Sequence, residues 1–442
     1  MALRTTAATS TWAPICRSEV RARWRPASLS FASLILVAAA LATPAQAARL
    51  YVSNEDGHSV TVLDAASDAV VATIEVGKRP RGLKLSADGS RLFVAVSGLP
   101  KCPPSVPDEE CAKLERDLKA DGIAVVDTAT QKVLQVLHAG SDPEQFALSR
   151  DGRRLFVANE DSASLSVVDV NSGAIVARVA VGQEPEGVAV TPDGRWVLVT
   201  NESDNSVSII DTGTLKIAKS VQVGKRPRDV AFTPDGRTAY ISGEFDASVY
   251  RMGVPEGAPV ERVLQLRKEA RPMGVVLDSK RGRVYVSTGR GGSVAVIDAA
   301  SHELLEEVKV GTRPWGIALS QDGRWLYTAN GPSNDVSVID TSTLQVVRTV
   351  RVGNSPWGVA VGPEPPAKAR KQSSEAESSG GEPAVAVRLG LGLPVALGHL
   401  LGLVGVAEDA AAFAGEARVP RVGLRFDELL VAQDACDPVD GA

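Results

Sequence analysis

Hydrophobic and polar residues alternate with a period of two in short runs between residues 50 and 362. Examples are LYVSN (50–54), SVTVLD (59–64) and VVATIEVG (70–77). Such alternation is typical of β-strands that pack one face against a neighbour. Turns such as ADGSR and PDGRW separate many of the runs, and their glycines can supply the positive φ that a tight hairpin needs. The pattern predicts many short antiparallel strands.

A short proline motif recurs seven times in the same region. The copies are VGKRPRG (76–82), AGSDPEQ (139–145), VGQEPEG (181–187), VGKRPRD (223–229), KEARPMG (268–274), VGTRPWG (310–316) and VGNSPWG (352–358). Their prolines stand at 80, 143, 185, 227, 272, 314 and 356, so that four of the six steps are 42 residues long. A period near 42 with four strand-like runs per unit indicates a β-propeller.

The ends of the repeated region predict how the ring closes. The first unit begins at its second strand, 50–54, and the missing first strand is found at 358–362. Three N-terminal strands and one C-terminal strand then complete one blade and leave no free edge. We therefore predict an all-β fold, a seven-bladed propeller with four-stranded blades, over residues 48–363. The one step of 63 residues places an insertion at 97–121 in the second blade.

Two polar positions recur at strand ends. Third strands close with an aspartate, which we expect to accept backbone N–H bonds of the next turn. Second strands often close with an asparagine, which we expect to bond loop backbone. The aspartates are Asp64, Asp169, Asp211, Asp298 and Asp340, and the asparagines are Asn54, Asn159, Asn201 and Asn330.

The segments that flank the repeats differ from them in composition. Residues 1–47 contain a basic stretch, an apolar run (29–42) and the small-residue pattern Ala45-Gln46-Ala47. Together these features predict a secretion signal that is cleaved after Ala47, and therefore a periplasmic protein. The alternative is an uncleaved membrane anchor. Residues 364–442 begin as a Ser/Glu/Lys/Gly linker and continue as a tail that is either disordered or a frameshifted translation. A poor membrane segment at 389–407 is a further alternative, but we expect no integral membrane domain.

Composition narrows the classes of chemistry. A net charge of −5 favours neither nucleic acid nor an anionic membrane surface as a partner. The chain has four histidines and no C-x-x-C pair, and no nucleophile–base pair can be nominated, so we predict no metal site and no catalytic residue. Cys102 and Cys111 lie nine apart in the insertion, where an oxidising compartment favours a disulfide. We expect a monomer.

The strand motifs YVSN, LFVAN and LVTN, together with the proline motif, resemble the YVTN-family β-propellers over residues 49–363. The insertion KCPPSVPDEEC (101–111), GSDPEQF (140–146) and NGPSNDVSVID (330–340) resemble the propeller proteins associated with PQQ-dependent catabolism. That resemblance implies an exported, seven-repeat protein that works beside quinoprotein alcohol oxidation and ABC transport. It supplies no catalytic residues.

Residues around the motif prolines are expected to rim the channel mouth, because they precede the innermost strand of each blade. One predicted sector is basic and aromatic, and the other is acidic and suits a partner protein or a cation. Guanidinium groups beside indoles suit a flat, carboxylated aromatic ligand such as PQQ. The alternative is that these side chains form ion pairs between blades. The first set is Arg79, Arg81, Arg228, Arg313, Trp315 and Trp357, and the second is Asp142, Glu144, Glu184 and Glu186.

The leading functional prediction is a non-catalytic, exported binding or scaffold propeller. It would serve PQQ-dependent alcohol oxidation, with a periplasmic quinoprotein dehydrogenase or an ABC transporter component as partner. The alternative is a propeller enzyme of the lactonase type, or a haem-binding propeller related to nitrite reductase domains. A surface antigen or adhesin is a third reading, which depends on the tail.

Overall fold

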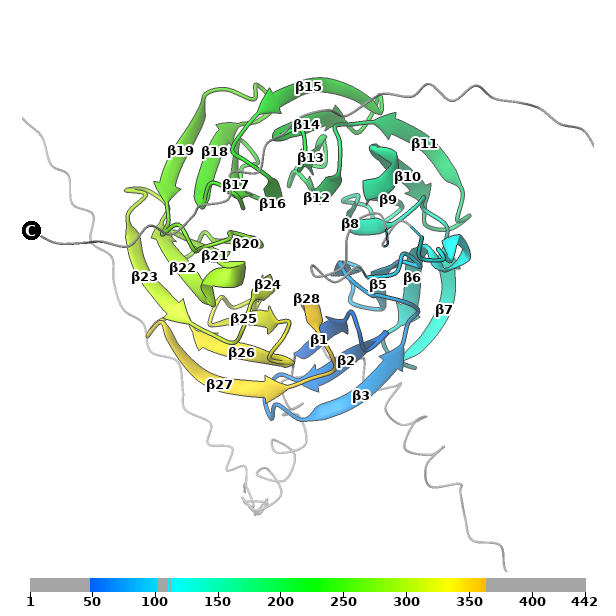
Figure 1. The fold of residues 1–442 in the computed structure, drawn as a ribbon, viewed down its shortest axis with the longest axis horizontal. Coiled ribbons are helices and arrows are strands. Elements are labelled where there is room, and N and C mark those ends of the chain that lie inside the picture. The colour runs from blue at the N-terminus through cyan, green and yellow to red at the C-terminus, as the bar shows by residue number, and fades with distance from the viewer. Residues whose placement is uncertain (1–47, 102–109, 111–112, 363–442) are drawn as a thin grey trace, which may run out of the picture. The chain divides into compact units, whose positions relative to one another are not determined.

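The computed structural model describes residues 48–101, 110 and 113–362. They form seven four-stranded antiparallel sheets around a central opening (Figure 1), which confirms the predicted seven-bladed propeller. The predicted leader, the tail, Cys102 and Cys111 lie outside the described residues, so what the sequence indicates for them stays a prediction. No helix in this part of the chain has the length and apolar character that a membrane crossing requires.

The blades are numbered in ring order, each from its innermost to its outermost strand. Blade 1 contains β28 (Pro356–Gly362), β1 (Arg49–Asn54), β2 (Ser59–Asp64) and β3 (Val70–Glu75); blade 2 contains β4 (Leu83–Leu85), β5 (Arg91–Val96), β6 (Gly122–Asp127) and β7 (Lys132–Leu137). Blade 3 contains β8 (Pro143–Leu148), β9 (Arg154–Asn159), β10 (Ser164–Asp169) and β11 (Ile175–Ala180); blade 4 contains β12 (Pro185–Val190), β13 (Trp196–Asn201), β14 (Ser206–Asp211) and β15 (Lys216–Gln222).

The remaining blades follow the same order. Blade 5 contains β16 (Pro227–Phe232), β17 (Thr238–Gly243), β18 (Ser248–Gly253) and β19 (Val260–Gln265); blade 6 contains β20 (Val275–Asp278), β21 (Arg283–Ser287), β22 (Ser293–Asp298) and β23 (Leu304–Lys309). Blade 7 contains β24 (Pro314–Leu319), β25 (Trp325–Asn330), β26 (Asp335–Asp340) and β27 (Gln345–Arg351). Short 3-10 turns are η1 (Leu118–Ala120), η2 (Glu160–Ser162) and η3 (Gly289–Gly291).

The ring closes as the sequence predicts. Strand β28, orange in Figure 1, pairs antiparallel with β1, blue, so that Leu50 faces Val361 and Val52 faces Val359. The first and last described strands therefore lie in one sheet, and blade 1 has the same four strands as the others.

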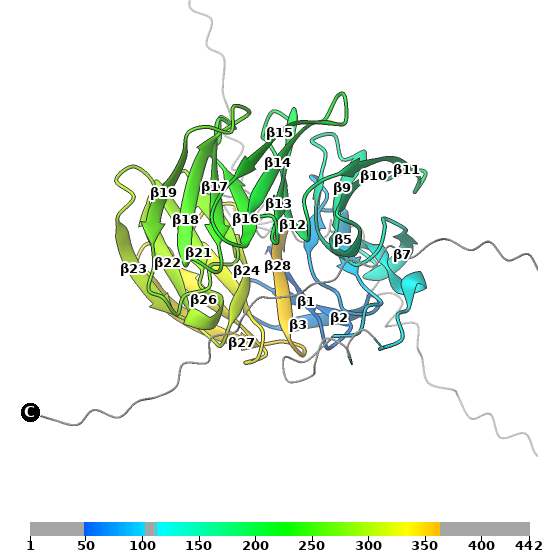
Figure 2. The same ribbon diagram turned by 45° about the horizontal axis from the view of Figure 1, so that its top comes forward.

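The hydrophobic core lies between neighbouring blades rather than at the centre of the ring. In one cluster, Tyr51 and Val62 of blade 1 pack with Leu92 and Val94 of blade 2, all nearly inaccessible to solvent. The tilted view in Figure 2 shows the sheets standing side by side around the opening. Since each blade buries its faces on its neighbours, the ring must be complete for the core to be covered.

The recurring aspartates act as predicted. Asp64 Oδ1, for example, accepts the backbone N–H groups of Ala66 and Ser67 at 3.1 and 2.9 Å. The recurring asparagines bond loop backbone and also tie strands together. Asn201 Oδ1 accepts the N–H of Gly182 in the preceding loop at 3.1 Å, as predicted. Its amide donates to the hydroxyls of Ser206 and Ser208 in the next strand, at 2.9 and 3.0 Å, and Asn54 bonds two hydroxyls in the same way.

Glycine after the motif proline allows the innermost strands of neighbouring blades to approach closely. A Cβ on Gly187 would lie 2.2 Å from the carbonyl oxygen of Arg228 in the next blade. A hydroxyl completes this junction, because Thr200 Oγ1 accepts the N–H of Gly187 at 2.8 Å and donates to the same Arg228 carbonyl at 3.1 Å. Ser287 links Gly274 to the Trp315 carbonyl in the same way.

The close approach predicts that Gly187→Ala lowers the free energy of unfolding by about 2 kcal/mol or more, because the methyl group forces neighbouring backbones apart. Gly213→Ala is the matched control. Its Cβ would meet only the Asp211 carboxylate at 3.4 Å, and it should change stability by no more than about 0.5 kcal/mol. Urea unfolding followed by circular dichroism measures both. Equal stabilities of the two variants would contradict the role given to this junction.

Candidate functional site at the channel mouth

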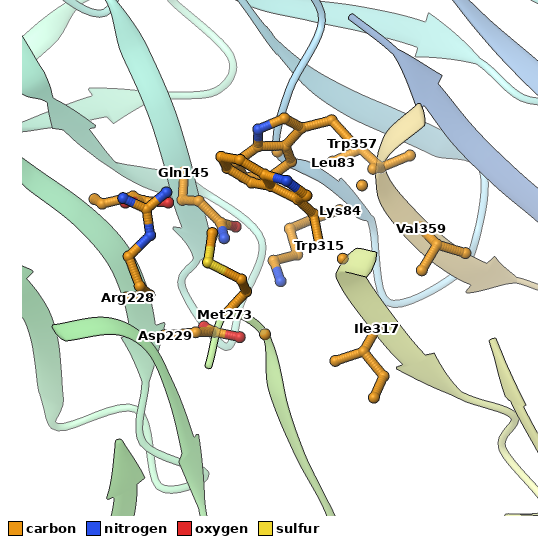
Figure 3. A pocket seen from close by; sticks show the side chains of 15 residues that line it. Leu83, Lys84, Gln145, Arg228, Asp229, Met273, Trp315, Ile317, Trp357 and Val359 are labelled. Carbon is orange, nitrogen blue, oxygen red and sulfur yellow. The ribbon is translucent and has the colours of Figure 1, made fainter. Parts of the chain in front are cut away.

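A cavity opens at the centre of the ring, where the innermost strands begin (Figure 3). Its cavity volume is about 50 Å³. Its walls include Glu186, Arg228, Met273, Trp315 and Trp357, the residues that follow the motif proline in five blades. The structure thus places these residues at the channel, as the motif position suggested. Whether they bind a ligand is a separate question.

The backbone at this mouth is strained in a repeated way. Six of the seven residues before the motif prolines have φ between 42° and 54°: Arg79, Asp142, Glu184, Arg226, Arg313 and Ser355. Residues other than glycine seldom adopt this left-handed region. The repeat therefore sets charged or polar side chains at positions where glycine would be less strained.

Residues that follow the motif proline meet in pairs across blade junctions. Arg81 of blade 2 contacts Glu144 of blade 3 through a hydrogen-bonded ion pair. Glu186 of blade 4 contacts Arg228 of blade 5 at 2.7 Å. The indole rings of Trp315 and Trp357, from blades 7 and 1, lie 5.4 Å apart between centroids. Opposite charges therefore meet at the junctions of blades 2 and 3 and of blades 4 and 5, and the predicted division into a basic and an acidic sector stays a prediction.

The Arg81 guanidinium is buried among carboxylates of blade 3. It pairs with Asp142 and Glu144 and lies 3.9 Å from Glu160, and the three acids have oxygens within 4.8 Å of one another. Burial opposes the charge on Asp142, but Arg81 and the Ser97 hydroxyl outweigh it and lower the pKa of Asp142. Burial and the neighbouring Asp142 charge raise the pKa of Glu160. Because Arg81 supplies the counter-charge, this cluster is an inter-blade ion-pair network.

A second network surrounds Arg228. Its guanidinium is buried and pairs with Glu186 and Glu202, while Glu244 lies 3.7 Å away. Arg226 joins the same acids, at 2.6 Å from Glu202 and 3.2 Å from Glu244.

Arg79 and Glu184, two further predicted charged residues, also have partners. Arg79 pairs with Glu55 at 2.8 Å, and Glu184 accepts the Ser203 hydroxyl at 2.6 Å. For Arg79, Arg81 and Arg228 the structure shows the ion pairs that the alternative interpretation expected, and a ligand role for them stays a prediction.

Arg313 differs from the other predicted cations. Its side chain is exposed, and the guanidinium lies 5.0 Å from the centroid of the Trp315 ring. No acidic partner holds it within the described part of the chain. Partial burial and the nearby guanidinium of Arg290 lower the pKa of Arg313. Two neighbouring cations beside Trp315, with no ion-pair partner for Arg313 among the described residues, form an electrostatic environment that favours an anion.

Sequence reasoning missed three residues of the cavity wall: Lys84, Gln145 and Asp229 (Figure 3). Gln145 and Asp229 occupy the position that is glycine in the other five motifs. A comparison of the repeats with one another could have singled them out.

A family model for the cytochrome D1 heme domain matches residues 113–247 and 272–359, together just over half of the chain. The chain belongs to the cytochrome D1 heme domain family. A curated relative, antigen Lp49 of Leptospira interrogans, is 30% identical over 111 residues. That match covers 25% of this chain and 23% of the antigen.

Solved structures show the same architecture for this cytochrome D1 heme domain protein. Hydrazine synthase of Kuenenia stuttgartiensis is 23% identical with a TM-score of 0.58, covering 66% of this chain and 92% of that chain. The periplasmic gluconolactonase of Pseudomonas aeruginosa (22%, TM-score 0.57) and a putative 6-phosphogluconolactonase of Bacteroides fragilis (16%, TM-score 0.58) each cover 72% of this chain and 99% of their own. At these identities the likeness shows the fold alone.

The family implies a haem, whose iron takes an axial ligand from His, Met, Cys or Tyr. Among the residues that line the described cavity, Met273 alone carries such a group. The three described histidines, His58, His138 and His302, do not line it. The donor groups of the cavity wall therefore do not fit a haem whose iron is held by a histidine.

The ion-pair networks predict that removing different arginines lowers the free energy of unfolding by different amounts. Arg81→Met leaves buried carboxylates without a counter-charge and should lower the free energy of unfolding by about 3–5 kcal/mol. Arg313→Met removes a cation that has no acidic partner and should change it by no more than about 0.5 kcal/mol. Urea denaturation at neutral pH compares them. A wild-type-like stability for Arg81→Met would show that the network does not join blades 2 and 3.

Proposed function

We propose that the channel mouth binds a small anionic ligand with a flat, unsaturated ring, and that the protein is a periplasmic binding propeller. The observation that carries the proposal is Arg313, an exposed cation that lies over Trp315, close to Arg290, and has no acidic partner among the described residues. An arginine can bind a carboxylate through two parallel hydrogen bonds, while indole surfaces stack on a ring.

The ligand class is a planar, conjugated compound with several carboxylates. Family membership supports a tetrapyrrole of the haem d1 kind, held by its ring face and carboxylates rather than by a histidine on the iron. PQQ has the same recognition chemistry and is the ligand that the predicted arginines and tryptophans at the channel mouth suggested. A quinoprotein dehydrogenase or an ABC transporter component is the partner that the PQQ branch of this proposal would require.

Titration of the full-length protein with PQQ tests the proposal. We expect tryptophan fluorescence to be quenched, and Arg313→Ala to weaken binding about tenfold or more, since a charged hydrogen bond contributes about 1.5–3 kcal/mol. Arg324→Ala is the matched control, because Arg324 also lies over an indole, at 4.6 Å from the Trp325 centroid, but Trp325, unlike Trp315, does not line the cavity.

A metal-free dicarboxylate porphyrin is titrated in parallel to separate the two ligand types. Tighter binding of the porphyrin favours the tetrapyrrole, and tighter binding of PQQ favours the quinone. Absence of binding by both compounds, or equal losses in the Arg313 and Arg324 variants, would contradict the proposed site.

A second candidate function, lactone hydrolysis, is favoured by Asp229. Its carboxyl lies in the cavity wall, and burial raises its pKa while the charge of Lys84 opposes the rise. A carboxylate of raised pKa can act as a general base near neutral pH. It would take a proton from water as the oxygen attacks the lactone carbonyl. The proton would then pass to the ring oxygen as its bond to carbonyl carbon breaks.

This second candidate predicts a specific pH dependence. Turnover of a sugar-acid lactone should rise with pH as Asp229 ionises, because the base acts in its charged form. Asp229→Asn should abolish turnover above the uncatalysed rate, while Asp235→Asn, in an exposed turn, should keep it. The assay is acid release at constant pH. An Asp229→Asn variant with full activity would exclude this mechanism.

A further inference from the structure

Lys84 is an exception among the seven innermost strands. Lys84, in the innermost strand of blade 2, pairs with Phe93 in the second strand of that blade. In each of the other six blades, the innermost-strand residue that pairs with the same position of the second strand is the equivalent of Lys84. Those six equivalents are small and apolar: Ala147, Ala189, Ala231, Val276, Ala318 and Ala360. The fold therefore accepts a small apolar side chain here, and nothing in the repeat requires a lysine.

The Lys84 amine has no structural partner. The side chain is exposed, and no ion pair or hydrogen bond joins it to another described residue. Figure 3 shows the amine extending into the cavity near Met273 and the two indoles. This contrasts with Arg81 and Arg228, whose charges are neutralised by carboxylates of neighbouring blades.

Asp229 is the second exception, and it lies in blade 5, across the channel from blade 2. It replaces the motif glycine, and its carboxylate accepts the N–H of Val230 at 2.8 Å and of Val275 at 3.0 Å. The charge of Lys84 favours ionisation of Asp229, against the burial that raises its pKa.

Four charged residues line this cavity: Lys84, Glu186, Arg228 and Asp229. Glu186 and Arg228 pair with each other at 2.7 Å, and Glu202 and Glu244 also face Arg228. Arg313, beside Trp315, is the further cation at the mouth. Lys84 and Asp229 are thus the charged wall residues that remain outside the ion-pair networks.

We propose that Lys84 and Asp229 determine specificity by selecting a ligand that extends one carboxylate into the channel. This inference rests on the proposed function of the mouth as an anion site. Lys84 binds the inserted carboxylate, while Asp229 repels it unless Asp229 takes up a proton. The ring then lies against Trp315 and Trp357, with another carboxylate on Arg313.

Two consequences distinguish this arrangement from attraction by the mouth alone. Binding takes up a proton, because an anion beside Asp229 favours its neutral form, so affinity falls as pH rises through the pKa of Asp229. Esterification of the ligand carboxylates removes the contribution of Lys84.

The test is calorimetric titration of full-length variants with PQQ and with its trimethyl ester. Lys84→Gln should weaken PQQ binding about tenfold or more and leave ester binding within about twofold. Lys225→Gln, an exposed lysine outside the cavity wall, is the matched control and should match wild type. Asp229→Asn should bind PQQ more tightly, without proton uptake when titrated in buffers of different ionisation enthalpy. Circular dichroism checks that each variant is folded.

The outcomes separate this inference from the function on which it rests. If Arg313→Ala weakens PQQ binding and Lys84→Gln does not, the mouth binds the ligand but the channel pair does not select it. If Asp229→Asn keeps the proton uptake of wild type, another group is the proton acceptor and the pair is excluded. If the wild type binds neither compound, the proposed function fails and this inference fails with it.

Discussion

Close backbone contact between the innermost strands is the constraint on which the rest of the structure depends. At the junction of blades 4 and 5, a Cβ on Gly187 would lie 2.2 Å from a carbonyl oxygen of the next blade. The position tolerates a side chain only where the junction is rearranged, as at Asp229, whose carboxylate bonds the N–H of Val275 instead. Because seven such junctions close one ring, local packing fixes the width of the channel mouth and the spacing of its side chains.

The seven-bladed architecture could be predicted from the sequence because each repeat independently indicates the same four-stranded unit. Seven motifs, the alternating strands and the split first unit all required seven blades, and the pairing of Leu50 with Val361 confirms the closure. The Asp-Gly turns also followed from local chemistry, since Gly89 and its equivalents adopt positive φ. The left-handed residues before the prolines did not follow, because arginine and glutamate carry no local signal for that conformation.

The site was only partly predictable. Motif position placed Trp315, Trp357 and Arg228 at the channel, because a fixed offset from the proline means a fixed place in each blade. The charge of a residue in the sequence could not show whether an acidic side chain of another blade would pair with it. Arg81 and Arg313 have the same chemistry in the sequence, but Glu144 of the adjacent blade pairs with the first, and no acid among the described residues forms an ion pair with the second. That difference depends on which side chains meet across junctions.

A repeat protein supplies its own comparison for separating structure from function. Side chains that recur in most blades, such as the aspartates that cap turns, are explained by the fold. Lys84 stands where the other six blades have alanine or valine, Asp229 stands where five blades have glycine, and both line the cavity. An unpaired amine among small apolar equivalents does nothing for packing that alanine would not do. Its place in the channel wall therefore fits the proposed binding of an anion rather than a role in the stability of the ring.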